Sequence, residues 1–127
     1  MRLLIKNGRV VHPVTGNVQL QDMLLEHGRV GLLEHGLTCE ADRTVDASGL
    51  MVAPGLVDMH VHLRDPGLTY KEDILTGCAA AARGGVTSMA CMANTSPAVD
   101  CPQQVKYVLD RAKAANGVGV YPIAALS

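Results

Sequence analysis

The most constraining feature of this 127-residue chain is an alternation of short apolar segments with amphipathic ones from Pro54 onward. The apolar segments 55–61, 86–92 and 118–126 are typical of strands, and the segments between them have helical spacing. Strands joined by helices of about a dozen residues pair in parallel through right-handed crossovers. A parallel sheet requires cover on both faces and closed or protected edges. We therefore expect residues 54–127 to be the truncated start of a larger α/β fold.

Both expected helices have start and stop signals. Thr69 and Glu72 fit a capping box for the first helix, and Gly84-Gly85 ends it. Asp100 opens the second helix with a similar pattern, and Asn116-Gly117 stops it. The expected buried stripes are Ile74, Leu75, Cys78, Ala79 and Ala82 in the first helix, and Val105, Val108, Leu109 and Ala112 in the second.

Residues 1–53 have a β-like pattern and are expected to form a separate, small antiparallel β unit. Asn7-Gly8 lies between apolar segments and predicts a hairpin turn, because both residues tolerate positive φ. A second hairpin is predicted around His27-Gly28, and a short strand over 44–46. Segment 55–61, after this unit, is apolar enough to predict a strand buried on both faces.

Composition and charge exclude several classes of function. The net charge of −1 provides no basic face, so we expect no nucleic-acid binding and no membrane-surface role. No apolar segment reaches the roughly 18 residues of a spanning helix, and the first residues lack a signal-peptide pattern. The four cysteines lack C-x-x-C spacing, which predicts free thiols and a cytoplasmic protein.

The segment that carries chemistry is His60-Val61-His62, at the end of the first expected parallel strand. Alternate strand residues face one side, so His60, His62 and Arg64 share a face as long as the strand persists. Two such imidazoles, roughly 6–7 Å apart along the strand, can lean onto one metal ion, with Asp58 as an outer group. Histidine pairs of this spacing also occur as surface or core residues, but sites of parallel α/β folds lie at this end of the strands. His12, His27 and His35 lack this context and are expected to be turn or surface residues.

Two further polar residues follow strand ends. Arg64 is consistent with a surface ion pair or with a guanidinium that binds a substrate carboxylate through two hydrogen bonds, and its place beside the histidines favours the second. Asn94 follows segment 86–92. It fits an Asx turn, which spacing favours, or an amide that donates to the same carboxylate.

These residues resemble a known family. Segment 58–67, Asp-Met-His-Val-His-Leu-Arg-Asp-Pro-Gly, resembles the metal-binding signature of dihydroorotases in the amidohydrolase superfamily. The likeness continues through 71–73, 76–77, 80–87, 92–95 and Pro97, and segment 53–58 also resembles the start of such enzymes. It covers essentially the whole chain. It implies a (β/α)8 TIM barrel with a small β-sandwich. Residues 1–53 are then the N-terminal share of the sandwich, and 54–127 the first β/α units.

The resemblance also implies an activity. Dihydroorotases use zinc to interconvert N-carbamoyl-L-aspartate and L-dihydroorotate in pyrimidine synthesis. The implied metal ligands are His60 and His62, and the implied substrate-binding residues are His62, Arg64 and Asn94. The general acid/base and the remaining ligands are expected beyond residue 127, so we expect the 127-residue chain to be inactive by itself. We consider two kinds of protein partner: further copies of the same chain, in a homo-oligomer, and aspartate carbamoyltransferase.

Three alternatives stay open at the level of sequence. An allantoinase or hydantoinase has the same His-x-His strand but less need for Arg64. The second alternative is a non-catalytic dihydroorotase-like scaffold subunit. Such proteins typically lose metal ligands, whereas this chain has both histidines. The third is a β-α-β domain without a metal site.

Overall fold

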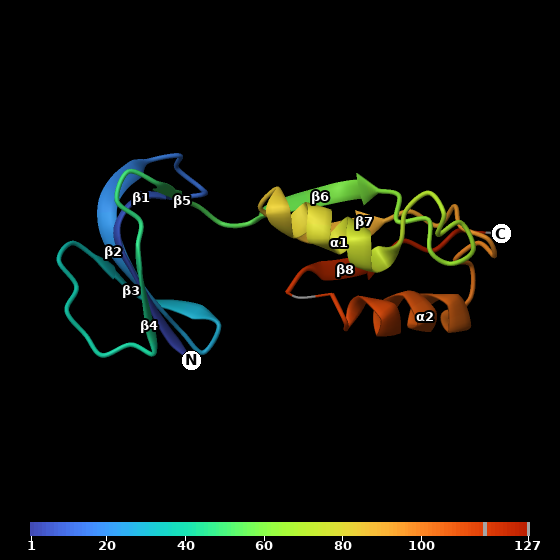
Figure 1. The fold of residues 1–127 in the computed structure, drawn as a ribbon. Coiled ribbons are helices and arrows are strands. Elements are labelled where there is room, and N and C mark those ends of the chain that lie inside the picture. The colour runs from blue at the N-terminus through green and yellow to red at the C-terminus, as the bar shows by residue number, and fades with distance from the viewer. Residues whose placement is uncertain (116, 127) are drawn as a thin grey trace. The chain divides into compact units, whose positions relative to one another are not determined.

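The computed structural model describes residues 1–115 and 117–126. The chain folds as two compact units, the first ending at Pro54 and the second beginning at Gly55 (Figure 1). The first unit contains the strands β1 (Arg2–Val11), β2 (Val18–Glu26), β3 (Arg29–Glu34), β4 (Arg43–Asp46) and β5 (Met51–Val52). The second contains β6 (Leu56–Val61), α1 (Ile74–Arg83), β7 (Val86–Cys91), α2 (Pro102–Ala112) and β8 (Gly119–Pro122). No helix in the described ranges is long and apolar enough to cross a membrane.

The sheet of the first unit is mixed, so the expectation of a purely antiparallel unit is wrong. Strands β1, β2 and β3 form an antiparallel meander, but β4 and β5 both pair with β1 in parallel. The strand order is β3-β2-β1-β4. The chain between β3 and β4 must therefore pass β2 and β1 before β4 pairs, and a crossover of this kind, unlike a tight turn, permits parallel pairing.

The hairpin expected at Asn7-Gly8 is also wrong, because β1 runs straight through these residues. The pairing changes from Ile5 with Met23 to Gly8 with Gln21, so β1 carries one extra residue there, which is a β-bulge. Asn7 takes the positive φ of 60°. Gly8 leaves no room for a side chain, since a Cβ there would lie 2.5 Å from Cγ2 of Val52. The same tolerance of unusual φ that suggested a turn serves a bulge instead.

The other local predictions for this unit are confirmed. His27 and Gly28 have φ values of 52° and 74° and connect β2 to β3 as a two-residue turn. Strand β4 covers the expected segment 44–46. The small core of the unit is formed by Leu4, Leu24 and Leu37.

Asp22 is a buried charge that stabilises the bulge. Its side chain accepts the backbone N–H of Asn7 at 2.7 Å and lies 3.7 Å from Nζ of Lys6, while the residue is 4% exposed. We expect Asp22→Ala to lower the free energy of unfolding by about 1–3 kcal/mol, because the Asn7 donor loses its partner. Denaturant unfolding followed by circular dichroism measures this. Glu40→Ala, at an exposed acidic residue of the same unit, is the control and should change stability by less than about 0.5 kcal/mol.

The same carboxylate makes the effect depend on pH. The hydrogen bond from Asn7 lowers the pKa of Asp22, with a smaller contribution from the charge of Lys6. A carboxyl whose pKa is lower in the folded state stabilises the fold above its unfolded pKa of about 3.9, and this contribution disappears as the pH falls through the folded pKa. The difference in stability between the parent chain and Asp22→Ala should therefore shrink below about pH 4. A difference that grows in acid contradicts this account.

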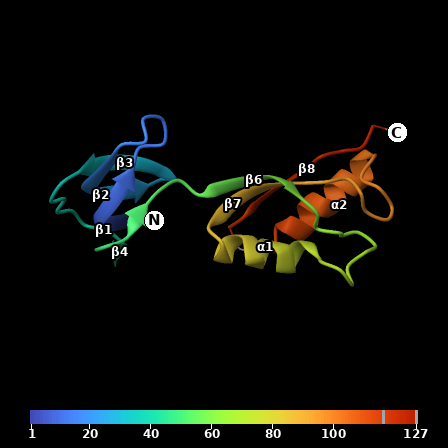
Figure 2. The ribbon, with the colours of Figure 1, turned by 90° about the horizontal axis from the view of Figure 1, so that it is seen from above.

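The second unit confirms the parallel alternation. Strands β6, β7 and β8 form one sheet in that order, and both pairings are parallel. Figure 2 shows α1 and α2 on the same side of this sheet. The core between sheet and helices consists of Leu63, Ile74, Cys78, Met89, Cys91, Val99, Val108, Val118 and Val120. Strand β8 is shorter than the expected segment 118–126.

The helix starts differ from those predicted. Helix α1 is capped by Asp73, whose Oδ1 accepts the N–H groups of Leu75 and Thr76 at 2.7 and 2.8 Å. Thr69 is therefore not the cap, because residues before 73 belong to the loop that follows β6. Helix α2 begins after Cys101 without a side-chain cap, so the capping box at Asp100 is also wrong. The expected stop at Asn116-Gly117 involves residue 116, which lies outside the described residues.

Burial departs from expectation on the strand and on both helices. Leu56, Val57 and Met59 of β6 are 61%, 65% and 77% exposed, so β6 is not buried on both faces. The reason is that β6 is the edge strand of this sheet. Of the predicted stripes, Ile74, Cys78 and Val108 are buried, whereas Ala79, Ala82 and Leu109 are exposed.

Candidate metal and carboxylate site

Strand β6 places the two histidines on the face of the sheet that carries no helix. Val61 and Leu63 pack into the core on the helix side. Because strand side chains alternate, His60 and His62 extend toward the opposite face. His60 is exposed and His62 is half-buried. Both lie at the carboxyl end of β6, as predicted for a site of a parallel α/β fold.

The two imidazoles approach each other closely. Their Nε2 atoms are 3.3 Å apart, and the rings are 5.1 Å apart at an angle of 68°. Two nitrogens on one tetrahedral zinc ion, each with a Zn–N bond of about 2.0–2.1 Å, are separated by about 3.4 Å. The observed spacing therefore fits two ligands of one zinc ion, and the rings are not splayed to opposite sides.

Asn94 contacts the second histidine. Its Oδ1 lies 2.8 Å from Nδ1 of His62, across the loops that follow β6 and β7. With Nδ1–H donating to Asn94, the neutral imidazole keeps a lone pair on Nε2, which is the atom that faces His60. The sequence favoured an Asx turn for Asn94, but this oxygen binds the histidine instead. This contact was not predicted from the sequence, although both residues follow neighbouring parallel strands.

Asp58 acts on the backbone of the site. Its Oδ1 accepts the N–H of His60 at 3.0 Å. This hydrogen bond involves the backbone of His60 and not its imidazole ring. Asp58 therefore supports the position of His60 without being a proposed ligand itself. The outer role expected for Asp58 stays a prediction, because this hydrogen bond reaches the backbone of His60 and not its ring.

Arg64 does not continue the face of the strand. Strand β6 ends at Val61, and Arg64 has a φ of 60° in the left-handed region. Its carbonyl accepts the N–H of Leu68 at 2.9 Å, which closes a turn. Within residues 1–115 and 117–126, its half-buried guanidinium makes no hydrogen bond or ion pair. The condition for a shared strand face, that the strand persists to Arg64, is therefore not met, and the partnership of Arg64 with a substrate carboxylate stays a prediction.

The described residues bring together two candidate metal ligands at this site and no more. No group of three or more histidine, cysteine or acidic side chains is placed to hold an ion anywhere in the described ranges. Catalytic zinc sites typically use three protein ligands. His60 and His62 thus fit zinc as part of a ligand set.

The cysteines form no disulfides, and the two buried ones are not candidates for a nucleophile. Cys39, Cys78, Cys91 and Cys101 are free thiols, as predicted. Burial raises the pKa of the Cys78 thiol and of the Cys91 thiol. Reactive thiols need the opposite shift, so these two side chains serve the core.

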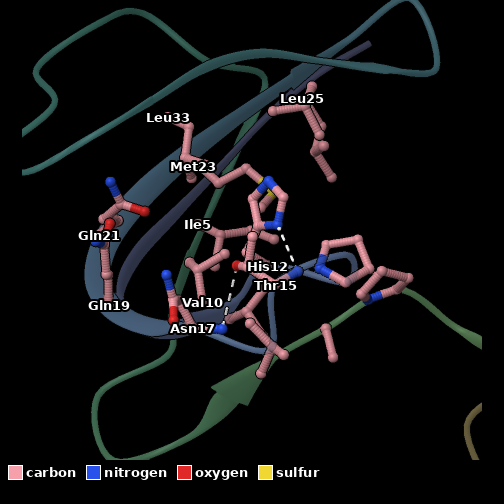
Figure 3. A pocket seen from close by; sticks show the side chains of 16 residues that line it. Ile5, Val10, His12, Thr15, Asn17, Gln19, Gln21, Met23, Leu25 and Leu33 are labelled. Atoms are coloured by element: carbon pink, nitrogen blue, oxygen red, sulfur yellow. Dashed lines mark hydrogen bonds between the residues drawn. The ribbon is translucent and has the colours of Figure 1, made fainter.

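A cavity of about 660 Å³ lies in the first unit (Figure 3). Its lining is largely apolar, with Ile5, Val10, Met23 and Leu25 around it. His12 also lines it, but Nδ1 of this histidine accepts the N–H of Thr15 at 3.3 Å, as expected of an exposed turn residue. A cavity of about 200 Å³ borders Asp58 and His62.

Comparisons with known proteins identify the family. Residues 49–127 match the family model described as dihydro-orotase-like, so the chain belongs to the dihydro-orotase-like family. The chain is 52% identical to a dihydroorotase of Geobacter sulfurreducens and 49% identical to one of Geotalea daltonii, each over 128 aligned residues. Each match covers 100% of this chain and 30% of the relative. The chain therefore spans about a third of the length of these relatives.

Solved structures agree with this at the level of the fold. An L-hydantoinase (dihydropyrimidinase) from Arthrobacter aurescens superimposes with a TM-score of 0.85 and 28% identity, over 96% of this chain and 27% of that one. A D-hydantoinase from Thermus sp. gives a TM-score of 0.77 at 25% identity, over 98% of this chain and 28% of that one. The α/β fold of the chain, with its mixed sheets, is similar to that of hydantoinase-type amidohydrolases.

Proposed function

We propose that this chain contributes two zinc ligands and a carboxylate-binding region to a dihydroorotase. The reaction is the reversible interconversion of N-carbamoyl-L-aspartate and L-dihydroorotate. The observation that carries the proposal is the 3.3 Å spacing of the His60 and His62 Nε2 atoms at the end of a parallel strand. The relatives named dihydroorotase, about half identical over the entire chain, support the same reaction.

Each residue has a distinct proposed role. His60 and His62 hold zinc, which supplies Lewis-acid chemistry to the hydrolysis of a cyclic amide. Asn94 fixes the ring of His62 through Nδ1 and borders the substrate together with His62. Arg64 pairs its guanidinium with the substrate carboxylate. Because this guanidinium has no protein partner in the described residues, its N–H groups are available for two parallel hydrogen bonds to the substrate.

We propose the following architecture for the longer protein. Residues 1–53 form a share of a small β-sandwich, and residues 54–127 form the first units of a (β/α)8 barrel. The apolar lining of the cavity on the first unit and the exposed edge strand β6 support this, because both expose surface that a complete domain covers. The four free thiols support a reducing, cytoplasmic setting.

A hydantoinase-type cyclic amidohydrolase is the second candidate. The TM-score of 0.85 to the L-hydantoinase favours it. The two candidates differ at Arg64, since a cyclic amide without a carboxylate gives a guanidinium no charge to bind. A non-catalytic scaffold is disfavoured because both histidines are present and correctly spaced.

The test uses a hybrid enzyme in which residues 1–127 replace the matching stretch of the Geobacter sulfurreducens relative. We expect the zinc-loaded hybrid enzyme to hydrolyse dihydroorotate, measured by loss of its ultraviolet absorbance. We expect the 127-residue chain alone to show no hydrolysis, because it supplies only two of the ligands. A folded hybrid enzyme that binds zinc but leaves dihydroorotate intact contradicts the proposed function.

A further inference from the structure

A buried carboxylate lies directly beside Arg64. Asp65 is 2% exposed, and its side chain points to helix α2. The hydroxyl of Tyr107 donates to Oδ1 of Asp65 at 2.8 Å, and Nε of Arg111 lies 3.5 Å from Oδ2. Asp65 is 42 residues from Tyr107 in sequence, so this contact ties the loop after β6 to a distant element.

The contact has a cost that the fold must offset. Burying a carboxylate is unfavourable unless hydrogen bonds and an opposite charge compensate. Oδ2 of Asp65 makes no hydrogen bond within the described residues, so Tyr107 and Arg111 carry this compensation. The hydrogen bond to Asp65 raises the pKa of Tyr107 above its ordinary value of about 10, so the hydroxyl stays protonated and donates over the whole neutral range. An apolar residue would fill the same space without these demands, so packing alone does not account for a carboxylate at this position.

The backbone of Arg64 has a conformation that the surrounding structure must maintain. A φ of 60° is uncommon for a residue with a long side chain and persists only where the surroundings impose it. Leu63 before it is 2% exposed in the core, and Asp65 after it is anchored on α2. The backbone of Arg64 is therefore held on both sides by a buried neighbour, and the side chains of these neighbours extend to the helix side of the sheet.

The same loop is fastened to the loop that carries Asn94. The N–H of Ser96 donates to the carbonyl of Pro66 at 3.1 Å. A Cβ on Gly67 would lie 1.7 Å from the carbonyl oxygen of Ser96, so the two backbones are in direct contact. Because of this contact, an anchor at Asp65 also fixes Arg64 relative to Asn94.

We infer that Asp65 is a positioning residue for Arg64: its contacts with Tyr107 and Arg111 hold the guanidinium where the substrate carboxylate binds. This inference rests on the proposed function and extends it to three residues that never touch the substrate. Helix α2 then takes part in selecting substrates with a carboxylate over cyclic amides that lack one. Arg64 supplies the charge, and the anchor supplies its position.

The first test is a comparison of Tyr107→Phe and Asp65→Asn in the zinc-loaded hybrid enzyme. We expect KM for dihydroorotate to rise roughly tenfold to a hundredfold, the range in which a small misplacement of a binding group acts. We expect a smaller change in kcat, with zinc content unchanged, since neither variant touches His60 or His62. The control is Lys106→Met on the same helix, whose ammonium pairs with Asp110 instead of Asp65; its KM should match the parent. An unchanged KM in Tyr107→Phe, which keeps the ring and removes only the donor, overturns the inference.

The second test asks whether the anchor acts through Arg64. In an Arg64→Lys background, Tyr107→Phe should change KM by no more than about twofold, because a residue acting through the guanidinium has no effect once it is removed. Independent effects that simply multiply indicate a general structural role and overturn the inference. A parent hybrid enzyme that does not hydrolyse dihydroorotate overturns the proposed function and the inference with it. An active parent with an unaffected Tyr107→Phe variant overturns the inference alone.

Discussion

Replacing Arg64 by Met in the hybrid enzyme is expected to lower kcat/KM for dihydroorotate by roughly 30- to 5,000-fold, the range for removing one partner of a buried charge pair. Arg64 makes no ion pair within the described residues, so the interaction that this substitution removes is the proposed one with the substrate. The carboxylate of dihydroorotate then enters the site without a counter-charge. Steady-state kinetics with dihydroorotate measure the change.

Two comparisons make the Arg64 result specific. Arg83→Met, at the exposed end of α1, removes an arginine far along the chain from the motif and should leave kcat/KM unchanged. Any slow hydrolysis of dihydrouracil, which has the same ring without the carboxylate, should be insensitive to Arg64→Met. If Arg64→Met hydrolyses dihydroorotate as well as the parent does, Arg64 does not bind the carboxylate and the hydantoinase alternative gains support.

Removing either histidine is expected to have a comparably large effect, through the metal. We expect His60→Ala and His62→Ala to weaken zinc binding by more than roughly 100-fold, since loss of even an outer-shell partner typically costs 10- to 100-fold. Hydrolysis of dihydroorotate should fall with the zinc content. Metal analysis after dialysis and activity at saturating zinc separate loss of binding from loss of chemistry.

The control for the histidine variants is His27→Ala. His27 occupies the exposed turn between β2 and β3, in the first unit. It should leave zinc content and hydrolysis unchanged, although its φ of 52° makes a small loss of stability expected. Full zinc occupancy in His62→Ala contradicts the proposed ligand pair.

The local pattern around the histidines was predictable because it depends on strand geometry alone. An apolar segment followed by His-x-His has only one way to place both rings on one face, whatever the rest of the chain does. The alternation of strands and helices after Pro54 was predictable for a similar reason, since periodicity records which face is buried. The 3.3 Å between the two Nε2 atoms depends in addition on the side-chain conformations, which only the structure shows.

Turn and cap signals were less informative. Asn7-Gly8 tolerates positive φ in a hairpin and in a bulge alike, and Val52 and Asp22 decided between them. Thr69 and Asp73 both offer a capping oxygen, and the chain continued as a loop until Asp73. In each case several local structures satisfy the same residues, and distant contacts select one.

The sequence by itself determined the parallel β-α-β-α-β order, the histidine pair and its end of the strand, because these depend on periodicities of neighbouring residues. Only the tertiary structure decided that Asn94 binds His62, that Arg64 leaves the strand, and that Asp65 is anchored on α2. The contacts of Asn94 and Asp65 join residues that are far apart in the chain, and the conformation of Arg64 depends on such contacts. The free energy that stabilises these contacts comes from burial and hydrogen bonds, which exist only once strands and helices have packed.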